Sequence, residues 1–268
     1  MTGLVARILP AGARGSRRAR YLVERNLLVA KTFWPTIASG FFEPVFYLFA
    51  VGIGIGRLAG EVTGPGGLPV PYEAFVAPAM LASSAMNGAV FETTHNVFFK
   101  LRYGKIYDAI LATPMQPADV AVGEITWSLL RGGVYGAAFL LVMAARGLIT
   151  SPWGLLAFPA ALLIGFAFSA VGMAAASFMR SWQDLDVVNL VTLPLFLFSA
   201  TFYPLDVYPP ALRALARLSP LYHGAELARA LTLGVIDAGL WVHVGFLVAM
   251  GGVGSVVAAR RLERLLLR

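Results

Sequence analysis

The chain has 268 residues, of which 58% are hydrophobic and only 13% are charged, and its net charge at pH 7 is +7. A soluble domain carries about 25% charged residues, so the composition excludes an ordinary soluble protein, which could not hide so much apolar surface from water. The positive charge does not indicate nucleic-acid binding, because the arginines gather at the chain ends and in short segments between apolar blocks.

Residues 1–32 predict a cytoplasmic tail followed by an amphipathic helix at residues 16–31. The polar arc of this helix consists of Arg17, Arg18, Arg20, Glu24, Arg25 and Lys31. The opposite, apolar arc consists of Leu22, Val23, Leu27, Val29 and Ala30. Such a helix lies in the membrane interface, with its basic face toward anionic lipid or a partner protein. A solvated basic tail is the alternative.

Residues 33–259 predict a domain of six transmembrane helices, so the expected fold class is an all-α membrane protein. Six apolar blocks are long enough, or nearly so, to cross about 30 Å of hydrocarbon. They lie at residues 33–56, 74–98, 118–145, 153–179, 186–203 and 238–259. With the N-terminus inside, fifteen lysines and arginines flank the blocks on the inner side and five on the outer side. This bias places both termini, including a basic tail at residues 260–268, in the cytoplasm.

Three connecting segments carry further signals. Residues 60–71 are rich in glycine and proline and predict an outer loop without regular structure. Residues 98–117 combine charged and apolar side chains up to Thr113-Pro114 and predict a short amphipathic inner helix that the proline ends. Residues 203–234 have leucines at helical spacing and a break at Ser219-Pro220, which predict two short helices dipping into the outer leaflet.

Four ionisable residues in the predicted spans are candidate functional sites, because charges are costly in hydrocarbon. Glu43 lies in the middle of the first span, either on a transport path or in a structural hydrogen bond. Glu124 and Arg131 lie two turns apart on one face of the third span, too far apart to pair directly, so each is expected to find a partner on another helix. Glu92 lies near the inner end of the second span, where an interfacial position is expected.

The motifs of nucleotide and metal chemistry are missing from the sequence. No phosphate loop of the form Gly-x-x-x-x-Gly-Lys-Ser/Thr occurs, so the chain is not expected to bind or hydrolyse ATP. The histidines at positions 95, 223 and 243 are isolated along the chain, and cysteine is absent, so no metal site is expected. We expect neither a bound cofactor nor an enzymatic activity on this chain.

The order of these elements resembles that of the type-2 ABC exporter permeases. Within that group, several segments are similar to the permease of the nodulation lipo-oligosaccharide exporters, in the same order and over nearly the whole chain. These segments are Glu43-Pro44 with Tyr47-Leu48-Phe49, Gly52-x-Gly54-x-Gly56, Tyr72-x-x-Phe75, Met80, Ser84-Ala85-Met86, Phe91-Glu92-Thr93, Gly123-Glu124 with Trp127, and Leu218-x-Pro220-Leu221 with His223.

The resemblance implies the permease subunit of an ATP-driven exporter in the bacterial inner membrane. Its cargo is expected to be an amphipathic molecule such as a lipo-oligosaccharide, a glycolipid, a polysaccharide or a drug. It implies a dimer of permease chains, identical or paralogous, docked on two separate ABC ATPase subunits that hold ATP and magnesium. The alternatives are a secondary transporter, for which no inverted repeat is evident, and a non-transporting membrane assembly protein.

The resemblance also assigns roles to two segments. Residues 98–114 correspond to the coupling helix that contacts the ATPase, and its expected contact residues are Lys100, Arg102, Lys105, Ile106, Tyr107, Asp108 and Leu111. Residues 203–234 correspond to an outer gate, and its expected residues are Tyr203, Pro204, Leu212, Leu215, His223 and Glu226.

Overall fold

Long apolar blocks form long helices in the computed structural model, which describes residues 18–32, 42, 45–46, 48–52 and 54–266. Among these residues, four helices are long and apolar enough to cross a membrane: Tyr72–Arg102, Pro117–Ala145, Pro152–Phe178 and Leu240–Leu266. They agree with the second, third, fourth and sixth predicted spans. Most of the first predicted span, including the candidate Glu43, lies outside the described residues.

The fifth predicted span is shorter than expected. It forms α10 (Gln183–Phe198), a helix of 16 residues that is about 24 Å long, compared with about 30 Å for the hydrocarbon core. All residues of α10 are described, and only Leu185 among them is buried. Leu190 and Leu193 are 72% and 58% exposed, so one chain by itself leaves most of this apolar helix uncovered.

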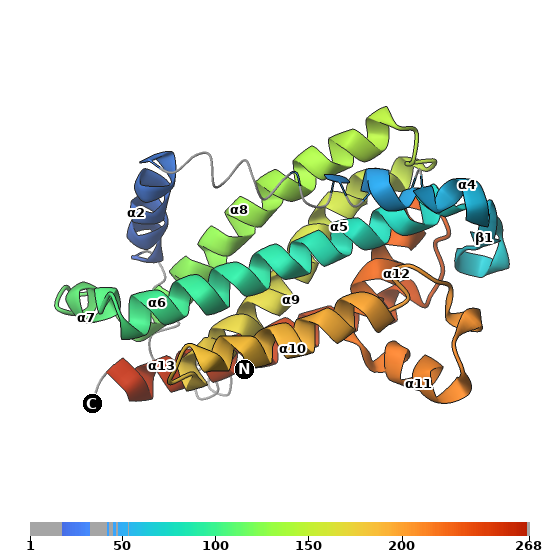
Figure 1. Cartoon of the computed structure of the whole chain (residues 1–268). Coiled ribbons are helices and arrows are strands. Elements are labelled where there is room, and N and C mark those ends of the chain that lie inside the picture. The colour runs from blue at the N-terminus through green and yellow to red at the C-terminus, as the bar shows by residue number, and fades with distance from the viewer. Residues whose placement is uncertain (1–17, 33–41, 43–44, 47, 53, 267–268) are drawn as a thin grey trace, which may run out of the picture.

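The helix α9 (Ala157–Phe178) is the centre of the bundle. It packs against α5 (Tyr72–Phe91), α8 (Pro117–Ala145), α12 (Pro220–Leu233) and α13 (Leu240–Leu266). The long helices run side by side along the longest dimension of the molecule (Figure 1). The short 3-10 helix η4 (Pro152–Leu156) leads directly into α9, so that both belong to the same candidate span.

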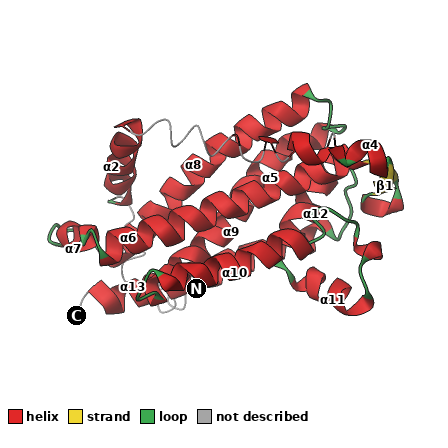
Figure 2. Ribbon diagram, viewed as in Figure 1, coloured by secondary structure: helices red, strands yellow, loops and turns green. Residues whose placement is uncertain are grey.

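Shorter elements and loops gather at the two ends of the bundle (Figure 2). At one end lie α2 (Ala19–Thr32), α7 (Ile106–Leu111) and the C-terminal end of α13. At the other end lie α4 (Gly56–Ala59), α11 (Pro210–Leu218) and α12. We call these the inner and the outer end, following the orientation that the basic residues predict. The helix α5 continues through a π-helical turn, η3 (Glu92–Asn96), into α6 (Val97–Arg102).

The glycine- and proline-rich outer loop forms a β-hairpin, although the sequence predicted no regular structure there. The strand β1 (Glu61–Thr63) pairs in antiparallel fashion with β2 (Pro69–Pro71), and the 3-10 turn η2 (Pro65–Gly67) joins them. Gly66 and Gly67 have φ angles of 71° and 77°, which glycine adopts without steric cost. The prediction was wrong because it took these glycines as a sign of irregular structure, whereas they make the turn of a hairpin.

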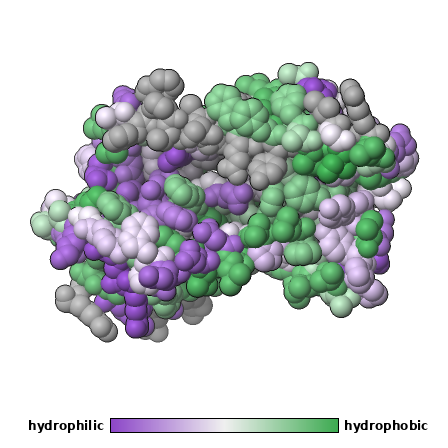
Figure 3. Space-filling model, in the orientation of Figure 1, coloured by the Kyte–Doolittle hydropathy of each residue, from purple (hydrophilic) through white to green (hydrophobic). Residues whose placement is uncertain are grey.

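The surface separates polar ends from an apolar middle. On the face drawn in Figure 3, hydrophilic residues gather at the end that holds α2 and α7, and hydrophobic residues cover much of the rest. Leu141 on α8 and Val253 on α13 are 71% and 66% exposed. Large exposed apolar side chains along the lengths of these helices form the kind of surface that lipid covers.

The helices α13 and α9 cross at a point where only glycine fits. A Cβ atom on Gly254 would lie 2.8 Å from the backbone nitrogen of Val171 and 2.9 Å from the carbonyl carbon of Ala170. A Cβ atom on Gly252, half a turn away, would meet no atom within 4 Å. Small residues allow this kind of close backbone approach between membrane helices.

We expect Gly254→Ala to destabilise the protein, because the backbone of α9 cannot move aside as a flexible side chain does. Overpacking of this kind costs about 1–3 kcal/mol, so the Tm in detergent should fall. The matched variant Gly252→Ala should keep the wild-type Tm or raise it, because alanine favours the helix. Thermal unfolding of both variants in the same detergent checks this prediction, and equal Tm values would contradict the proposed packing.

Candidate functional site

A buried carboxylate joins three other segments of the chain at the inner end of the bundle. Glu124 lies on α8, and its side chain is only 2% exposed. Its oxygens accept hydrogen bonds from Lys100 Nζ at 2.8 and 2.9 Å, from Tyr107 Oη at 2.9 Å and from Asn26 Nδ2 at 3.0 Å. These donors come from α6, α7 and α2. We call this arrangement the Glu124 junction.

The residue before Glu124 allows α2 to reach the junction. A Cβ atom on Gly123 would lie 2.7 Å from Leu22 Cδ2 and 3.2 Å from the carbonyl oxygen of Ala19, so α2 packs directly against α8 only because this position is glycine. Ala19, Leu22 and Asn26 are the buried residues of α2. Asn26 was not among the residues singled out from the sequence, although its spacing of four and seven residues from Leu22 and Ala19 places it on the packed face.

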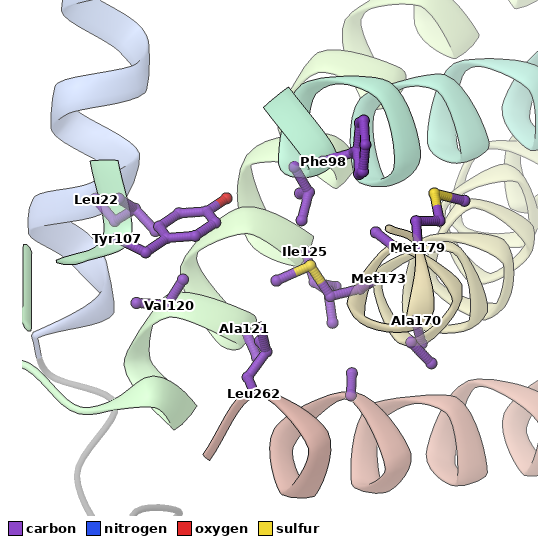
Figure 4. Packing of buried hydrophobic residues seen from close by; sticks show 14 of the residues in the cluster. Leu22, Phe98, Tyr107, Val120, Ala121, Ile125, Ala170, Met173, Met179 and Leu262 are labelled. Atoms are coloured by element: carbon purple, nitrogen blue, oxygen red, sulfur yellow. The ribbon is translucent and has the colours of Figure 1, made fainter. Parts of the chain in front are cut away.

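An apolar cluster surrounds the junction and excludes water from it. Leu22 of α2, Tyr107 of α7, Val120 of α8 and Phe98 of α6 all belong to this cluster (Figure 4). All four of these side chains are buried. The hydrogen bonds of the junction therefore act in a medium of low polarity, where charged partners interact more strongly than in water.

The junction contains one negative and one positive charge together with a neutral phenol. Burial, followed by the charge of Glu124, raises the pKa of Tyr107 well above its ordinary value of 10.0. The phenol therefore keeps its proton and donates a hydrogen bond to the carboxylate. Lys100, whose side chain is 15% exposed, balances the charge of Glu124. The junction thus fixes α7 to α8 and to α2.

The predicted coupling residues therefore do not share one exposed surface. Lys100 and Tyr107 turn inward to Glu124. The guanidinium of Arg102 donates hydrogen bonds of 2.9 and 3.1 Å to the carbonyl oxygen of Met179, just beyond the end of α9. These three side chains hold the segment in place rather than presenting it to a partner.

The segment predicted as one helix at residues 98–114 forms two shorter helices. The first part of that range belongs to α6, which continues the long α5 helix, and only α7 is a separate helix. Lys105, with a φ angle of 45°, separates the two, and sequence periodicity does not reveal such a left-handed residue. Lys105 and Asp108 are exposed, whereas Ile106 and Leu111 are partly buried.

A second buried ion pair joins Glu92 and Arg131. Arg131 Nη1 lies 2.7 Å from Glu92 Oε2, and the indole of Trp127 donates to Glu92 Oε1 at 2.9 Å. The prediction that Arg131 and Glu124 each find a partner on another helix is confirmed. Glu92, expected at the membrane interface, is buried among the helices of the bundle, where it begins the π-helical turn η3. Such turns are frequent at functional sites.

Ion pairs join the α5–α6 helix to α8, or to the residue just after it, at three levels. From the outer to the inner end they are Glu73–Arg146, Glu92–Arg131 and Lys100–Glu124, with nitrogen–oxygen distances of 2.9, 2.7 and 2.8 Å. We call them the ion-pair ladder. Because the two helices run in opposite directions, the ladder fixes their register along its whole length.

At the outer end, a buried arginine ties α12 to the bundle. Arg229 is completely buried, and its Nε donates to the carbonyl oxygen of Phe75 on α5 at 2.9 Å. Its Nη atoms donate to Glu226 Oε1 at 2.7 Å, to the carbonyl oxygen of Thr201 at 3.1 Å and to that of Ala200. Arg229 is one of the five outer basic residues counted above for the orientation of the chain, and no partner was predicted for it. The available signal was its spacing of three residues from Glu226 within an apolar helix.

The other predicted gate residues do not converge on one site. Tyr203, Leu212 and Leu215 are exposed, and Pro204 is partly buried. Glu226 belongs to the Arg229 contact. Residues 203–234 are therefore anchored on α12 and expose apolar side chains on α11.

Two histidines that are far apart in the sequence meet at this end. His223 on α12 and His243 on α13 have their Nδ1 atoms 2.8 Å apart. The interpretation of the histidines as isolated was wrong for this pair, because it considered spacing along one helix and not contact between two. Within the described part of the chain, no three histidine, cysteine or acidic side chains come together as metal ligands would.

The fold and the site together define an α-helical, membrane-embedded protein whose charged inner segment is fixed to its spans by buried polar contacts. Residues 17–233 match the family model described as ABC-2 type transporter, and the chain belongs to this family. It is accordingly the permease subunit of an ABC exporter. In this family the ATPase activity lies in a separate subunit.

Curated relatives align with the chain over most of its length. Nodulation protein J of Rhizobium leguminosarum bv. viciae is 31% identical over 252 residues, which cover 94% of this chain and 93% of the relative. The protein of the same name from Rhizobium leguminosarum bv. trifolii is 33% identical over 227 residues, covering 84% and 85%. That from Bradyrhizobium diazoefficiens is 28% identical over 269 residues, covering 98% of each.

Proposed function

We propose that this permease moves a lipo-oligosaccharide or a related amphipathic glycolipid out of the cytoplasm or the inner leaflet of a bacterial inner membrane. Similarity to nodulation proteins over most of the chain supports this class of cargo. The exposed apolar and aromatic side chains along the bundle suit a cargo that carries an acyl chain. ATP and magnesium are held by the partner ATPase.

The working unit in this proposal is a dimer of permease chains on two ATPase subunits, with six spans per chain and both termini in the cytoplasm. The four spans among the described residues, α10 and the block at residues 33–56 would make up the six. The excess of basic residues on one side supports this orientation. The location of α2, α7 and the C-terminal end of α13 at the same end of the bundle is consistent with it (Figure 1).

The observation that carries the coupling mechanism is the Glu124 junction. When the ATPases close on ATP, a force applied to the exposed side of α7 would pass through Tyr107 to Glu124 and so to α8. Through Lys100 the same carboxylate holds α6, which continues into α5. A push on one short helix would in this way move two spans and the interfacial helix α2 together. The outer segment at α11 and α12 would open as the inner end closes.

The exposed residues Lys105 and Asp108 are the ones we expect to contact the ATPase. Replacing both with alanine should lower ATP-driven uptake of glycolipid into inside-out vesicles by about tenfold, which corresponds to ~1.4 kcal/mol of contact free energy. The change should leave the expression and the Tm of the permease unaffected. The matched control is Glu61→Ala, which removes an exposed charge from the outer hairpin.

Co-purification of the ATPase with each variant separates binding from coupling. Loss of the ATPase from the double variant, or its retention without cargo-stimulated ATP hydrolysis, would support the role of α7. Transport at the wild-type rate by the double variant would contradict it. Equal losses in the double variant and in Glu61→Ala would also contradict it.

A further inference from the structure

A histidine pair forms a polar contact between α12 and α13. His223 Nδ1 and His243 Nδ1 lie 2.8 Å apart, and their ring centroids are separated by 5.0 Å. Phe246 of α13 stacks on His223 with a centroid distance of 4.1 Å. A hydrogen bond between two Nδ1 atoms contains one proton, because one ring donates and the other accepts.

This contact tolerates only some protonation states. With both rings neutral, or with one ring protonated, one Nδ1 carries a hydrogen and the other offers a lone pair. With both rings protonated, both Nδ1 atoms carry hydrogens and neither can accept. Two positive charges then face each other in a partly buried site, where their repulsion is weakly screened. The second proton therefore breaks the contact.

Burial favours the uncharged form of the pair, and two nearby carboxylates oppose this effect. The charged and titratable groups near the pair among the described residues are Tyr222 and Glu226 on α12 and Asp237 before α13, and the backbone of Arg217 on α11 also contacts His223. Burial, followed by the proximity of His243, lowers the pKa of His223, and a hydrogen bond to the backbone of Arg217 offsets part of this effect. Because the pKa of His223 is lowered, the contact is present at neutral pH and is lost as the pH falls.

We propose that the His223–His243 pair is a proton-operated latch of the outer helices. Acidification of the medium at the outer end adds the second proton and separates α12 from the outer part of α13. Arg229 still anchors α12 to α5, so α11 and α12 move as a unit about that anchor. The proposal rests on the proposed function only for the assignment of this end to the outer side. The chemistry of the pair depends neither on the cargo nor on the ATPase.

The cysteine-free chain allows a direct test with spin labels. Cysteines introduced at the exposed positions Ala214 on α11 and Val242 on α13 report the separation of the two helices in lipid nanodiscs. We expect the label–label distance to lengthen between about pH 8 and about pH 5, with the change on the acid side of the ordinary histidine value of about 6.5. His243→Asn, whose amide offers a hydrogen bond near the Nδ1 position and does not titrate, should remove this pH dependence. His95→Asn, which alters the remaining histidine, should retain it.

A distance that does not change with pH in the wild-type background would overturn the proposal, as would the same change in His243→Asn. His223→Asn provides a second non-titrating variant if His243→Asn does not fold, and the same loss of pH dependence is expected for it. Absence of ATP-driven export would refute the proposed function but would leave this distance change intact. The two failures are therefore distinguishable.

Discussion

Glu124→Ala is expected to cause the largest loss of function among single substitutions at the inner end. The change removes the acceptor for Lys100, Tyr107 and Asn26 at once. It leaves the ammonium of Lys100 mostly buried without a counter-charge, and breaking a buried pair in this way costs about 3–5 kcal/mol. We expect a lower Tm and loss of cargo-stimulated ATP hydrolysis in the reconstituted complex.

Two further variants separate charge burial from positioning. The double variant Glu124→Leu with Lys100→Met replaces the ion pair by apolar side chains, which is often neutral or stabilising, so much of the Tm should return. Coupling should remain impaired, because Tyr107 still has no acceptor on α8. The control Glu263→Ala alters an exposed glutamate of α13 at the same end. Full coupling in the double variant would contradict a positioning role for Glu124.

Arg229→Met is expected to give the largest effect at the outer end. The guanidinium is completely buried and satisfies carbonyl oxygens from α5 and from the turn after α10. Its removal leaves these oxygens and Glu226 without their donor, at a cost of about 3–5 kcal/mol. Ala200, with a φ angle of 55°, contributes one of these oxygens. The segment after α10 should therefore become more susceptible to proteolysis.

Arg229→Lys tests whether charge or shape matters at this site. A lysine ammonium keeps the charge but cannot donate hydrogen bonds to all the acceptors that the planar guanidinium contacts. We therefore expect the Tm to lie between those of wild type and Arg229→Met. Arg217→Met, at an exposed arginine of α11, is the matched control and should keep the wild-type Tm. Equal Tm values for Arg229→Met and Arg217→Met would show that the buried contacts contribute nothing to stability.

The sequence predicted the long helices well because the thickness of a bilayer sets a minimum length for an apolar block. It overestimated the length of the helix at α10. The composition of this segment resembles that of the other spans, but Pro194 lies within it and the helix ends at Phe198. It missed the hairpin, because strands of three residues leave almost no periodic signal.

The polar contacts were harder to predict, because they depend on the depth and rotation of each helix. That Glu124 has a partner on another helix follows from the energetics of buried charge. That the partners are Lys100, Tyr107 and Asn26 depends on how α2 and α7 fold back onto α8. No spacing along the chain reveals the meeting of His223 with His243.

The ion-pair ladder has a consequence for how the molecule can change shape. Sliding the α5–α6 helix along α8 by one turn, about 5.4 Å, would separate the partners of all three pairs in the same movement. Two buried charge pairs cannot be exposed to lipid together without a prohibitive loss of free energy. These two helices must therefore tilt and travel as a single rigid body. Any relative displacement during a transport cycle must then occur in elements that pack more loosely against the bundle, of which α10 is the clearest example.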